Sequence, residues 1–150
     1  MGIKSDKVLF GIGNNLRGDD GAGSFIARNF SQPDWITIDG KSAPENYTSV
    51  IKKLKPNLLI MIDSANMSLP GGIFRLIPLN KITHFQLSTH SMPLPLLIKY
   101  LTPYCKKIML IGIQPINAKL GEPLSKPVLD GCHKIIKKIK ENKINDIPII

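Results

Sequence analysis

The sequence has 150 residues, of which 43% are hydrophobic, and a formal net charge of +9 at pH 7. This length fits one domain, so we expect residues 1–150 to share a single core. No apolar run approaches the roughly 20 residues that span a bilayer, and the N-terminus lacks the apolar segment of a signal peptide. We therefore expect a cytoplasmic protein with no membrane partner.

Lysine supplies nearly all of the positive charge. The densest group of lysines lies in the last predicted helix, at positions 134, 137, 138, 140 and 143. A basic protein can bind nucleic acid, but no aromatic side chain is interleaved with these lysines, and only 6% of the chain is aromatic. We interpret the lysines as a solvated helix face and expect no nucleic-acid partner. No broad exposed apolar patch is evident from the sequence, so we expect a monomer.

Short apolar runs alternate with helical patterns along the chain. Strands are predicted at residues 7–13, 35–40, 58–62, 73–77 and 107–113. Helices are predicted at residues 22–30, 42–55 and 91–101 and from 125 to about 142, before an exposed C-terminal end. The alternation indicates an α/β fold with three layers: a twisted, mostly parallel sheet of about five strands with helices on both faces. Arg75 places residues 73–77 at a sheet edge, where the strand can be antiparallel.

Local signals mark where these helices begin. Ser42 and Glu45 have the spacing of a capping box, and Pro44 suits a first helical turn. The third helix is expected to start near Ser91, because a first turn tolerates proline. Ser125 is expected to cap the last helix.

Residues 11–23 form a glycine-rich loop between the first strand and the first helix. Such loops commonly hold a phosphate on backbone N–H groups at the helix N-terminus. Here Asp19 and Asp20 occupy the loop, and two negative charges would repel a phosphate. The glycines also depart from the dinucleotide fingerprint, because four residues separate Gly13 from Gly18. The loop argues against a nucleotide site and offers a carboxylate to a cation.

Three candidate ligands lie where predicted strands end or helices begin. Asp20 follows the first strand, Asp63 comes directly after the third, and His90 precedes the third helix. Ligands of doubly wound sheets bind beyond the carboxyl ends of the strands, so these side chains converge if the first and third strands are neighbours. Two carboxylates and an imidazole suit a borderline-to-hard metal ion with positions open for water or substrate.

Each of these residues also has an ordinary structural interpretation. Asp20, or Asp19 in its place, can cap the first helix. Asp63 can form a turn, and His90 can make a simple hydrogen bond in a first helical turn. Only their joint placement favours a site.

Other catalytic patterns do not occur. The sequence contains neither G-x-S-x-G nor H-E-x-x-H. Cys105 and Cys132 are too few for a disulfide framework, have no histidine beside them at a strand end, and are interpreted as small buried or half-buried groups. His84, in an irregular loop, and His133, in the lysine-rich helix, are weaker candidate ligands.

The motifs together resemble those of the hydrogenase maturation endopeptidases, which trim the large subunit of nickel-iron hydrogenases. The matching segments are residues 13–23, 38–46, 62–65, 89–94 and 110–115, and the similarity extends from Val8 to the last helix. It is greatest to the branch that serves formate-hydrogenlyase-type hydrogenases.

The resemblance implies a twisted five-stranded sheet between helices. It implies an endopeptidase that removes the C-terminal tail of the hydrogenase large-subunit precursor after nickel insertion. Asp20, Asp63 and His90 would contact this nickel, which the substrate contributes, and would carry the catalysis. Asp39 and Gly40 would lie in a substrate-recognition region.

Two other functions stay open at the level of sequence. One is a non-catalytic, metal-binding chaperone that recognises the immature subunit. The other is a small-ligand α/β binding domain with no metal. The general base of a hydrolysis is not identified by these motifs.

Overall fold

The computed structural model describes residues 6–88 and 92–150, which contain a mixed six-stranded sheet. The strands are β1 (Lys7–Ile12), β2 (Trp35–Lys41), β3 (Leu58–Asn66), β4 (Phe74–Ile77), β5 (Gln86–Leu87) and β6 (Lys107–Ile113). The main path runs β2-β1-β3-β6-β4, and β5 pairs with the end of β3. The first four strands of this path are parallel, whereas β4 runs antiparallel to β6 at the edge. The edge position predicted for residues 73–77 is confirmed.

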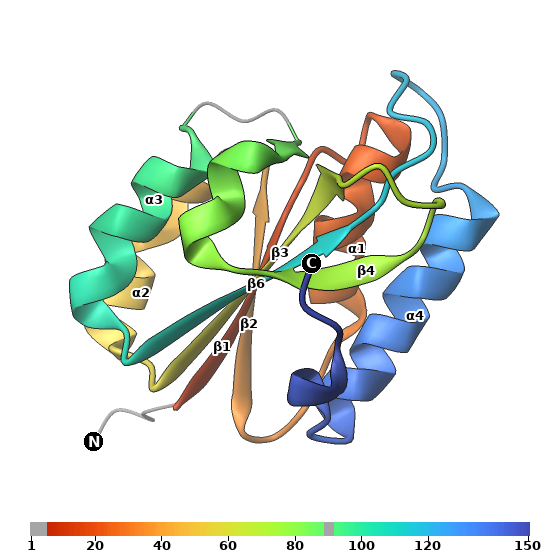
Figure 1. Cartoon of the computed structure of the whole chain (residues 1–150). Coiled ribbons are helices and arrows are strands. Elements are labelled where there is room, and N and C mark those ends of the chain that lie inside the picture. The colour runs from red at the N-terminus through yellow and green to blue at the C-terminus, as the bar shows by residue number, and fades with distance from the viewer. Residues whose placement is uncertain (1–5, 89–91) are drawn as a thin grey trace.

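Helices cover both faces of the sheet (Figure 1). They are α1 (Ala22–Asn29), α2 (Thr48–Leu54), α3 (Leu94–Leu101) and α4 (Lys126–Lys140). The pair α1 and α4 lies on one face, and the pair α2 and α3 lies on the other. The predicted three-layer α/β architecture is confirmed. Within the two described ranges, no helix is long and apolar enough to cross a membrane.

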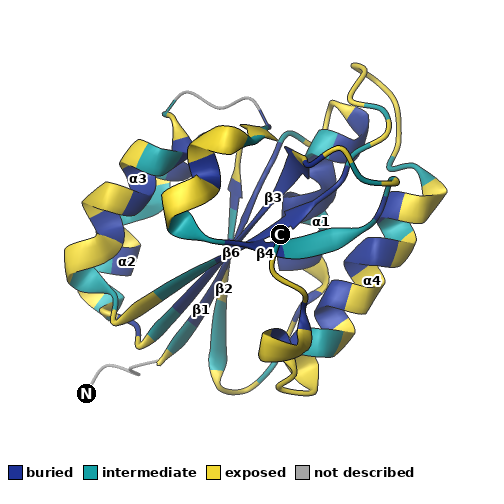
Figure 2. Cartoon of the chain, viewed as in Figure 1, coloured by how far each residue is buried: buried dark blue, intermediate teal, exposed yellow. Residues whose placement is uncertain are grey.

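The central strands β1, β3 and β6 are buried on both faces (Figure 2). Alternate residues of a strand point to opposite sides. Leu9 and Ile60 therefore pack under α1 and α4, while Phe10 and Met61 pack under α2 and α3. The continuous apolar runs that predicted these strands follow from burial on both sides.

Helix α1 approaches the strands closely at Gly23. A Cβ atom at this position would collide with the carbonyl oxygens of Ile12 and Ile62. Glycine thus lets the start of α1 rest on the carboxyl ends of β1 and β3. The short 3₁₀ helix η1 (Gly18–Gly21), which precedes α1 and carries both loop aspartates, is thereby set against the top of the sheet.

Strand β3 is longer than predicted, because it continues through Asp63 to Asn66. Asp63 pairs with Gly112 of β6, and Ala65 pairs with Leu87 of β5. The prediction that Asp63 comes after the strand is therefore wrong. The strand continues because pairing on both sides satisfies its backbone, which matters more than the polar side chains at its end.

Two predicted helix caps are also wrong. Residues 44–47 form the 3₁₀ helix η2 (Pro44–Tyr47), with Ala43 rather than Ser42 at its N-cap position and no side-chain cap. Ser125 does occupy the N-cap position of α4, but it makes no side-chain cap. The third helix is described from Leu94 onward, with Pro93 at its N-cap position, and Ser91 lies outside the described residues.

The end of the chain packs against the edge of the sheet, so the prediction of an exposed C-terminal end is wrong. Ile144 and Ile147 are buried. Leu76 of β4 donates from its N–H to the carbonyl of Pro148 at 2.9 Å, and Ile150 donates to the carbonyl of Leu76 at 3.1 Å. The segment covers the open edge of β4, which would otherwise present unpaired backbone groups.

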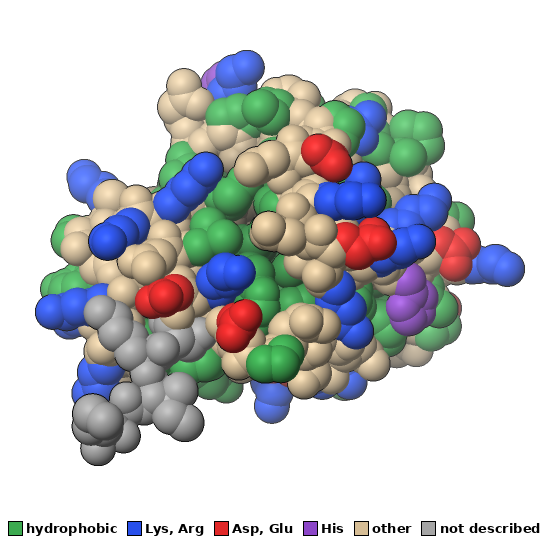
Figure 3. All heavy atoms as spheres, turned by 90° about the horizontal axis from the view of Figure 1, so that it is seen from below, with side chains coloured by type: hydrophobic (Ala, Val, Ile, Leu, Met, Phe, Trp, Pro, Cys, Tyr) green, Lys and Arg blue, Asp and Glu red, His purple; other side chains and the backbone are tan. Residues whose placement is uncertain are grey.

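In the face shown in Figure 3, lysine and arginine side chains are interspersed with carboxylates. On α4, the lysines at positions 134, 137 and 140 are exposed.

Asp19 ties together the loops after β1 and β6. Its buried carboxylate accepts hydrogen bonds from the N–H groups of Ile116 and Asn117, at 2.8 and 2.9 Å. It also accepts from the N–H and the hydroxyl of Ser125, both at 2.7 Å. The Ser125 hydroxyl is thus directed to Asp19 instead of capping α4. The loop between Ile116 and Ser125 is held to η1 by one side chain.

We predict that Asp19→Asn lowers the free energy of unfolding by about 2–4 kcal/mol. A carboxamide presents one oxygen and two N–H groups to four converging donors, so buried donors lose their partners. Urea unfolding at pH 7 measures the change. The matched control is Asp20→Asn, at the neighbouring carboxylate on the cleft, where we expect a loss below about 1 kcal/mol. Equal losses in the two variants would contradict this role for Asp19.

Candidate active site

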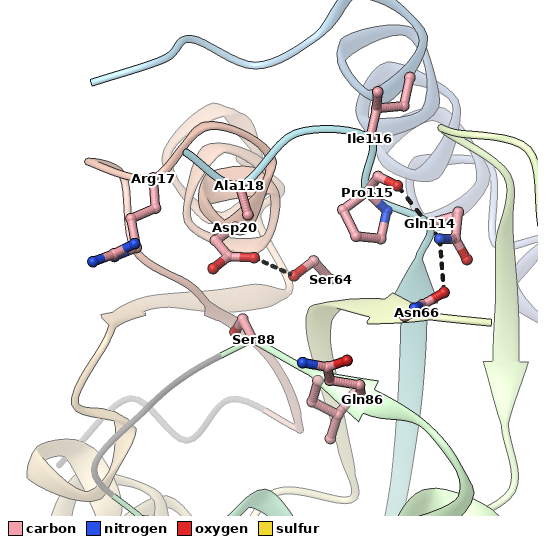
Figure 4. A pocket seen from close by; sticks show the side chains of 11 residues that line it. Arg17, Asp20, Ser64, Asn66, Gln86, Ser88, Gln114, Pro115, Ile116 and Ala118 are labelled. Atoms are coloured by element: carbon pink, nitrogen blue, oxygen red, sulfur yellow. Dashed lines mark hydrogen bonds between the residues drawn. The ribbon is translucent and has the colours of Figure 1, made fainter. Parts of the chain in front are cut away.

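A cleft of ≈ 550 Å³ opens at the carboxyl ends of β1, β3 and β6. Its wall is mainly polar (Figure 4). The lining residues are Arg17, Asp20, Ser64, Asn66, Gln86, Leu87, Ser88, Gln114, Pro115, Ile116 and Ala118. β1 pairs directly with β3, so the neighbour relation on which convergence depends is confirmed. The cleft lies where ligands of doubly wound sheets bind.

Asp20 projects into this cleft from η1. Its residue is half-buried, and its Oδ1 accepts a hydrogen bond from the Ser64 hydroxyl at 3.2 Å. Ser64 follows Asp63 on β3, so this bond joins the loop after β1 to the end of β3. The adjacent Asp19 is turned the other way into its structural contacts. Of the two loop aspartates, Asp20 is the one that faces the cleft.

Asp63 lies beneath the cleft and is fully buried. Its Oδ1 accepts a hydrogen bond from the hydroxyl of Ser88, which itself lines the cleft. Burial raises the pKa of Asp63 well above its usual range, hydrogen bonds from Ser88 and the backbone of Ser64 lower it, and the charge of Asp20 raises it. A cation between Asp20 and Asp63 would relieve both the burial penalty and the repulsion. The structure therefore brings these two predicted residues together.

His90, the third predicted ligand, lies outside the described residues. Its place beside Asp20 and Asp63 stays a prediction. Within residues 6–88 and 92–150, no group of three histidine, cysteine or acidic side chains is arranged to hold a metal ion. The described part of the site thus supplies at most two carboxylates to an ion.

Asp39 and Gly40 lie near the end of β2 and do not line the cleft. The Asp39 carboxylate accepts from the Ser24 hydroxyl at 2.7 Å and from the Lys41 N–H at 3.2 Å. Its other oxygen is 3.9 Å from Nε of Arg28. These contacts fasten β2 to α1. Substrate binding by Asp39 and Gly40 stays a prediction.

Gln114, which is not among the predicted site residues, organises the far wall of the cleft. Its buried Oε1 accepts from the N–H groups of Met67 and Leu69, at 2.6 and 3.3 Å. Its Nε2 donates to Asn66 Oδ1 at 3.1 Å (Figure 4). Gln114 directly follows β6, and its position as a polar residue at a strand end could have marked it as a candidate site residue. The hydroxyls of Ser64 and Ser88 carried no comparable signal.

The remaining candidates lie away from the cleft or are chemically unsuited. His84 and His133 are exposed, and the His133 ring meets Phe25 edge-on at 5.6 Å. Burial raises the pKa of the Cys105 thiol to about 11 and that of Cys132 to about 12. Both thiols stay protonated at neutral pH and are poor nucleophiles. The cleft chemistry in the described residues therefore rests on carboxylates, which can bind a cation or accept a proton from water.

Comparisons with known proteins agree with this geometry. Residues 23–142 match the HycI hydrogenase maturation protease family. The chain is 34% identical over 137 residues to the hydrogenase 3 maturation protease of Escherichia coli K12, covering 89% of this chain and 88% of the relative.

Solved structures show the same fold. A crystal structure of the hydrogenase 3 maturation protease has a TM-score of 0.82 and 34% identity, with 89% of this chain and 88% of that chain covered. The [NiFe] hydrogenase maturation protease HycI of Thermococcus kodakarensis KOD1 has a TM-score of 0.79 and 28% identity, with 93% of each chain covered. The matching family, the curated relative and the shared fold all agree, and the chain belongs to the hydrogenase maturation proteases.

Proposed function

We propose that this protein is an endopeptidase that removes the C-terminal tail from a [NiFe] hydrogenase large-subunit precursor after nickel has been inserted. One observation carries the proposal: in a member of this protease family, Asp20 bonds to Ser64 in the cleft, and the preceding residue, the buried Asp63, lies close enough for the charge of Asp20 to act on it. The relatives named above are proteases of the same class, and the chain covers most of their length. The cytoplasm is the compartment that we expect for this activity.

In this proposal nickel belongs to the substrate. Asp20, Asp63 and His90 would complete the coordination of an ion already held by the precursor, so docking also checks that the metal is present. Carboxylate and imidazole donors suit nickel. Two carboxylates and an imidazole form a thin site by themselves, so we expect weak metal binding in the absence of the precursor.

The carboxylates of Asp20 and Asp63 differ in their exposure to solvent. Asp20 is half-exposed and accepts from one serine hydroxyl, whereas burial keeps a proton on Asp63 over a wider pH range. An arriving cation would favour the ionised form of Asp63. A water molecule in the cleft could then be polarised by the ion or lose a proton to a carboxylate, and attack the scissile amide.

A second reading is a non-catalytic chaperone that binds the immature subunit through its metal. The same two carboxylates would serve it, so only cleavage separates the two functions. The family of proteases to which the chain belongs favours cleavage.

We predict that Asp20→Asn abolishes processing and leaves the fold intact. The carboxamide keeps the size of the side chain but removes the charge that faces the substrate cation, which costs several orders of magnitude in rate. Intact mass of the cognate precursor after incubation measures processing, and circular dichroism measures folding.

The matched control is Asp130→Asn, which removes an equivalent charge from the exposed face of α4. This variant should process the precursor at the wild-type rate. Full cleavage by Asp20→Asn would remove Asp20 from the mechanism.

We predict that Asp63→Asn also abolishes processing, and that its stability relative to wild type increases as pH rises. The pKa of Asp63 is raised in the folded state, so that state binds more protons above about pH 4 than the unfolded chain does. The wild-type free energy of unfolding therefore falls as pH rises through the folded-state pKa, and the variant lacks this fall.

Urea unfolding of both proteins between pH 4 and pH 8 tests the sign of this pH dependence, because the Asp63 carboxyl of the unfolded chain ionises near the lower limit. The difference between variant and wild type should grow in favour of the variant as pH rises. A variant that becomes less stable relative to wild type over this range would contradict the buried-carboxylate account.

A further inference from the structure

The side-chain amide of Gln114 is held in one orientation. Its Oε1 accepts hydrogen bonds from the backbone N–H groups of Met67 and Leu69, at 2.6 and 3.3 Å. An N–H group cannot donate to an amide nitrogen, so the nitrogen of Gln114 must lie on the other side. The backbone of Gln114 is fixed as well, because its N–H donates to the carbonyl of Ile73 and its carbonyl accepts from the N–H of Gly72, both at 2.8 Å. Gln114 is therefore a donor of fixed direction directly after β6.

This donor in turn fixes the amide of Asn66, the last residue of β3. Nε2 of Gln114 donates to Asn66 Oδ1 at 3.1 Å (Figure 4). The N–H of Ser68 donates to the same oxygen at 3.2 Å. If the Asn66 amide turned over, its nitrogen would face two N–H groups and both bonds would be lost. Asn66 Nδ2 is thus directed away from Gln114.

The N–H groups of Asn66 Nδ2 make no hydrogen bond within residues 6–88 and 92–150, where all bonds of this side chain go to Oδ1. Asn66 is exposed and lines the same cleft as Asp20. A donor of fixed direction in the wall of a cleft suits an acceptor on a ligand, because the side chain has already lost its conformational freedom on folding.

Asn66 lies close to the carboxylate that faces the cleft. Asn66 and Ser64 are alternate residues of β3, so they share one face of the strand, about 7 Å apart. The Ser64 hydroxyl bonds to Asp20. An extended peptide covers the distance between Asn66 and Ser64 in about two residues.

We propose that Asn66 Nδ2 donates a hydrogen bond to a backbone carbonyl oxygen of the precursor beside the scissile bond, and that Gln114 is the positioning residue for this contact. The inference rests on the proposed function, which places a peptide in the cleft. A peptide offers one carbonyl oxygen per residue whatever its sequence. The bond holds the peptide in register with the carboxylate of Asp20.

The first test compares Asn66→Ala with wild type on nickel-loaded precursor. Loss of one neutral hydrogen bond should raise KM about threefold to tenfold. The kcat at saturation should stay within about twofold of wild type, because the bond is made in the bound substrate and in the transition state alike. The melting temperature should stay close to that of wild type, since the residue is exposed. An unchanged KM, or a fall in kcat alone, would overturn the proposal.

Asn66→Asp tests which atom faces the precursor. Aspartate keeps the size of the side chain and an oxygen for Gln114, but presents a second oxygen in place of Nδ2. KM should rise at least as much as in Asn66→Ala, even though the added charge attracts the nickel of the precursor. Tighter binding than in the alanine variant would make the cleft-facing atom an acceptor and contradict the proposal. The matched control is Asn29→Asp, which adds the same charge at the exposed end of α1, outside the cleft lining, and should leave KM unchanged.

Gln114→Glu tests the positioning role. Glutamate still accepts from Met67 and Leu69, but its other oxygen cannot donate to Asn66 Oδ1, so the Asn66 amide turns over and KM rises as in Asn66→Ala. In the Asn66→Ala background the same substitution should raise KM by less than about twofold more, whereas a purely structural effect would add in full. Full additivity would overturn the role of Gln114. Circular dichroism checks that this variant folds, and the Asn66 variants decide the contact if it does not.

Binding is measured separately from cleavage. In an Asp20→Asn background, surface plasmon resonance on immobilised nickel-loaded precursor should show about threefold to tenfold weaker binding after Asn66→Ala. An unchanged dissociation constant would contradict the contact. If wild type does not cleave the cognate precursor, the proposed function fails, and this binding measurement still decides the role of Asn66.

Discussion

Four hydrogen-bond donors converge on the buried carboxylate of Asp19, and the shape of the cleft depends on this one cluster. Its partners are separated from it by 97 to 106 positions in the chain, so it joins two loops that are distant in sequence at the top of the sheet. Through it, the loop after β6 is held to η1, the element that also carries Asp20. A buried residue that does not line the cleft thereby holds together the loops that carry Asp20 and Ile116, which do.

The second constraint is a charge buried under the cleft. Strand β3 carries Asp63 into the interior, where its carboxyl group contacts Ser88 and senses Asp20. Such a group costs stability when ionised, and a protein retains it where a cation or a proton transfer gives it a use. The pairing of a buried acid with a cleft-facing acid is the physical basis of the proposed nickel-dependent hydrolysis.

Much of the fold could be predicted from the sequence, because apolar runs and helical periodicity report burial directly. The runs at residues 7–13 and 107–113 mark β1 and β6, and Arg75 correctly marks the edge strand. Local signals failed where distant residues decide the outcome. Ser125 was predicted to cap a helix, but its hydroxyl donates to Asp19. The C-terminal end was predicted to be exposed, but Ile144 and Ile147 are buried in the core, and Pro148 and Ile150 bond to β4. In the site, the placement of Asp20 near the strand that carries Asp63 followed from strand order, whereas the contacts of Gln114 and Ser88 required the three-dimensional structure.

The central claim is that this protease acts on a precursor that already holds nickel. The most direct measurement is the intact mass of the cognate large-subunit precursor, loaded with nickel or free of it, after incubation with this protein. The account predicts loss of the C-terminal tail from the loaded precursor alone. Loss from both samples would retain the protease but contradict the metal check, and loss from neither would contradict the peptidase assignment itself.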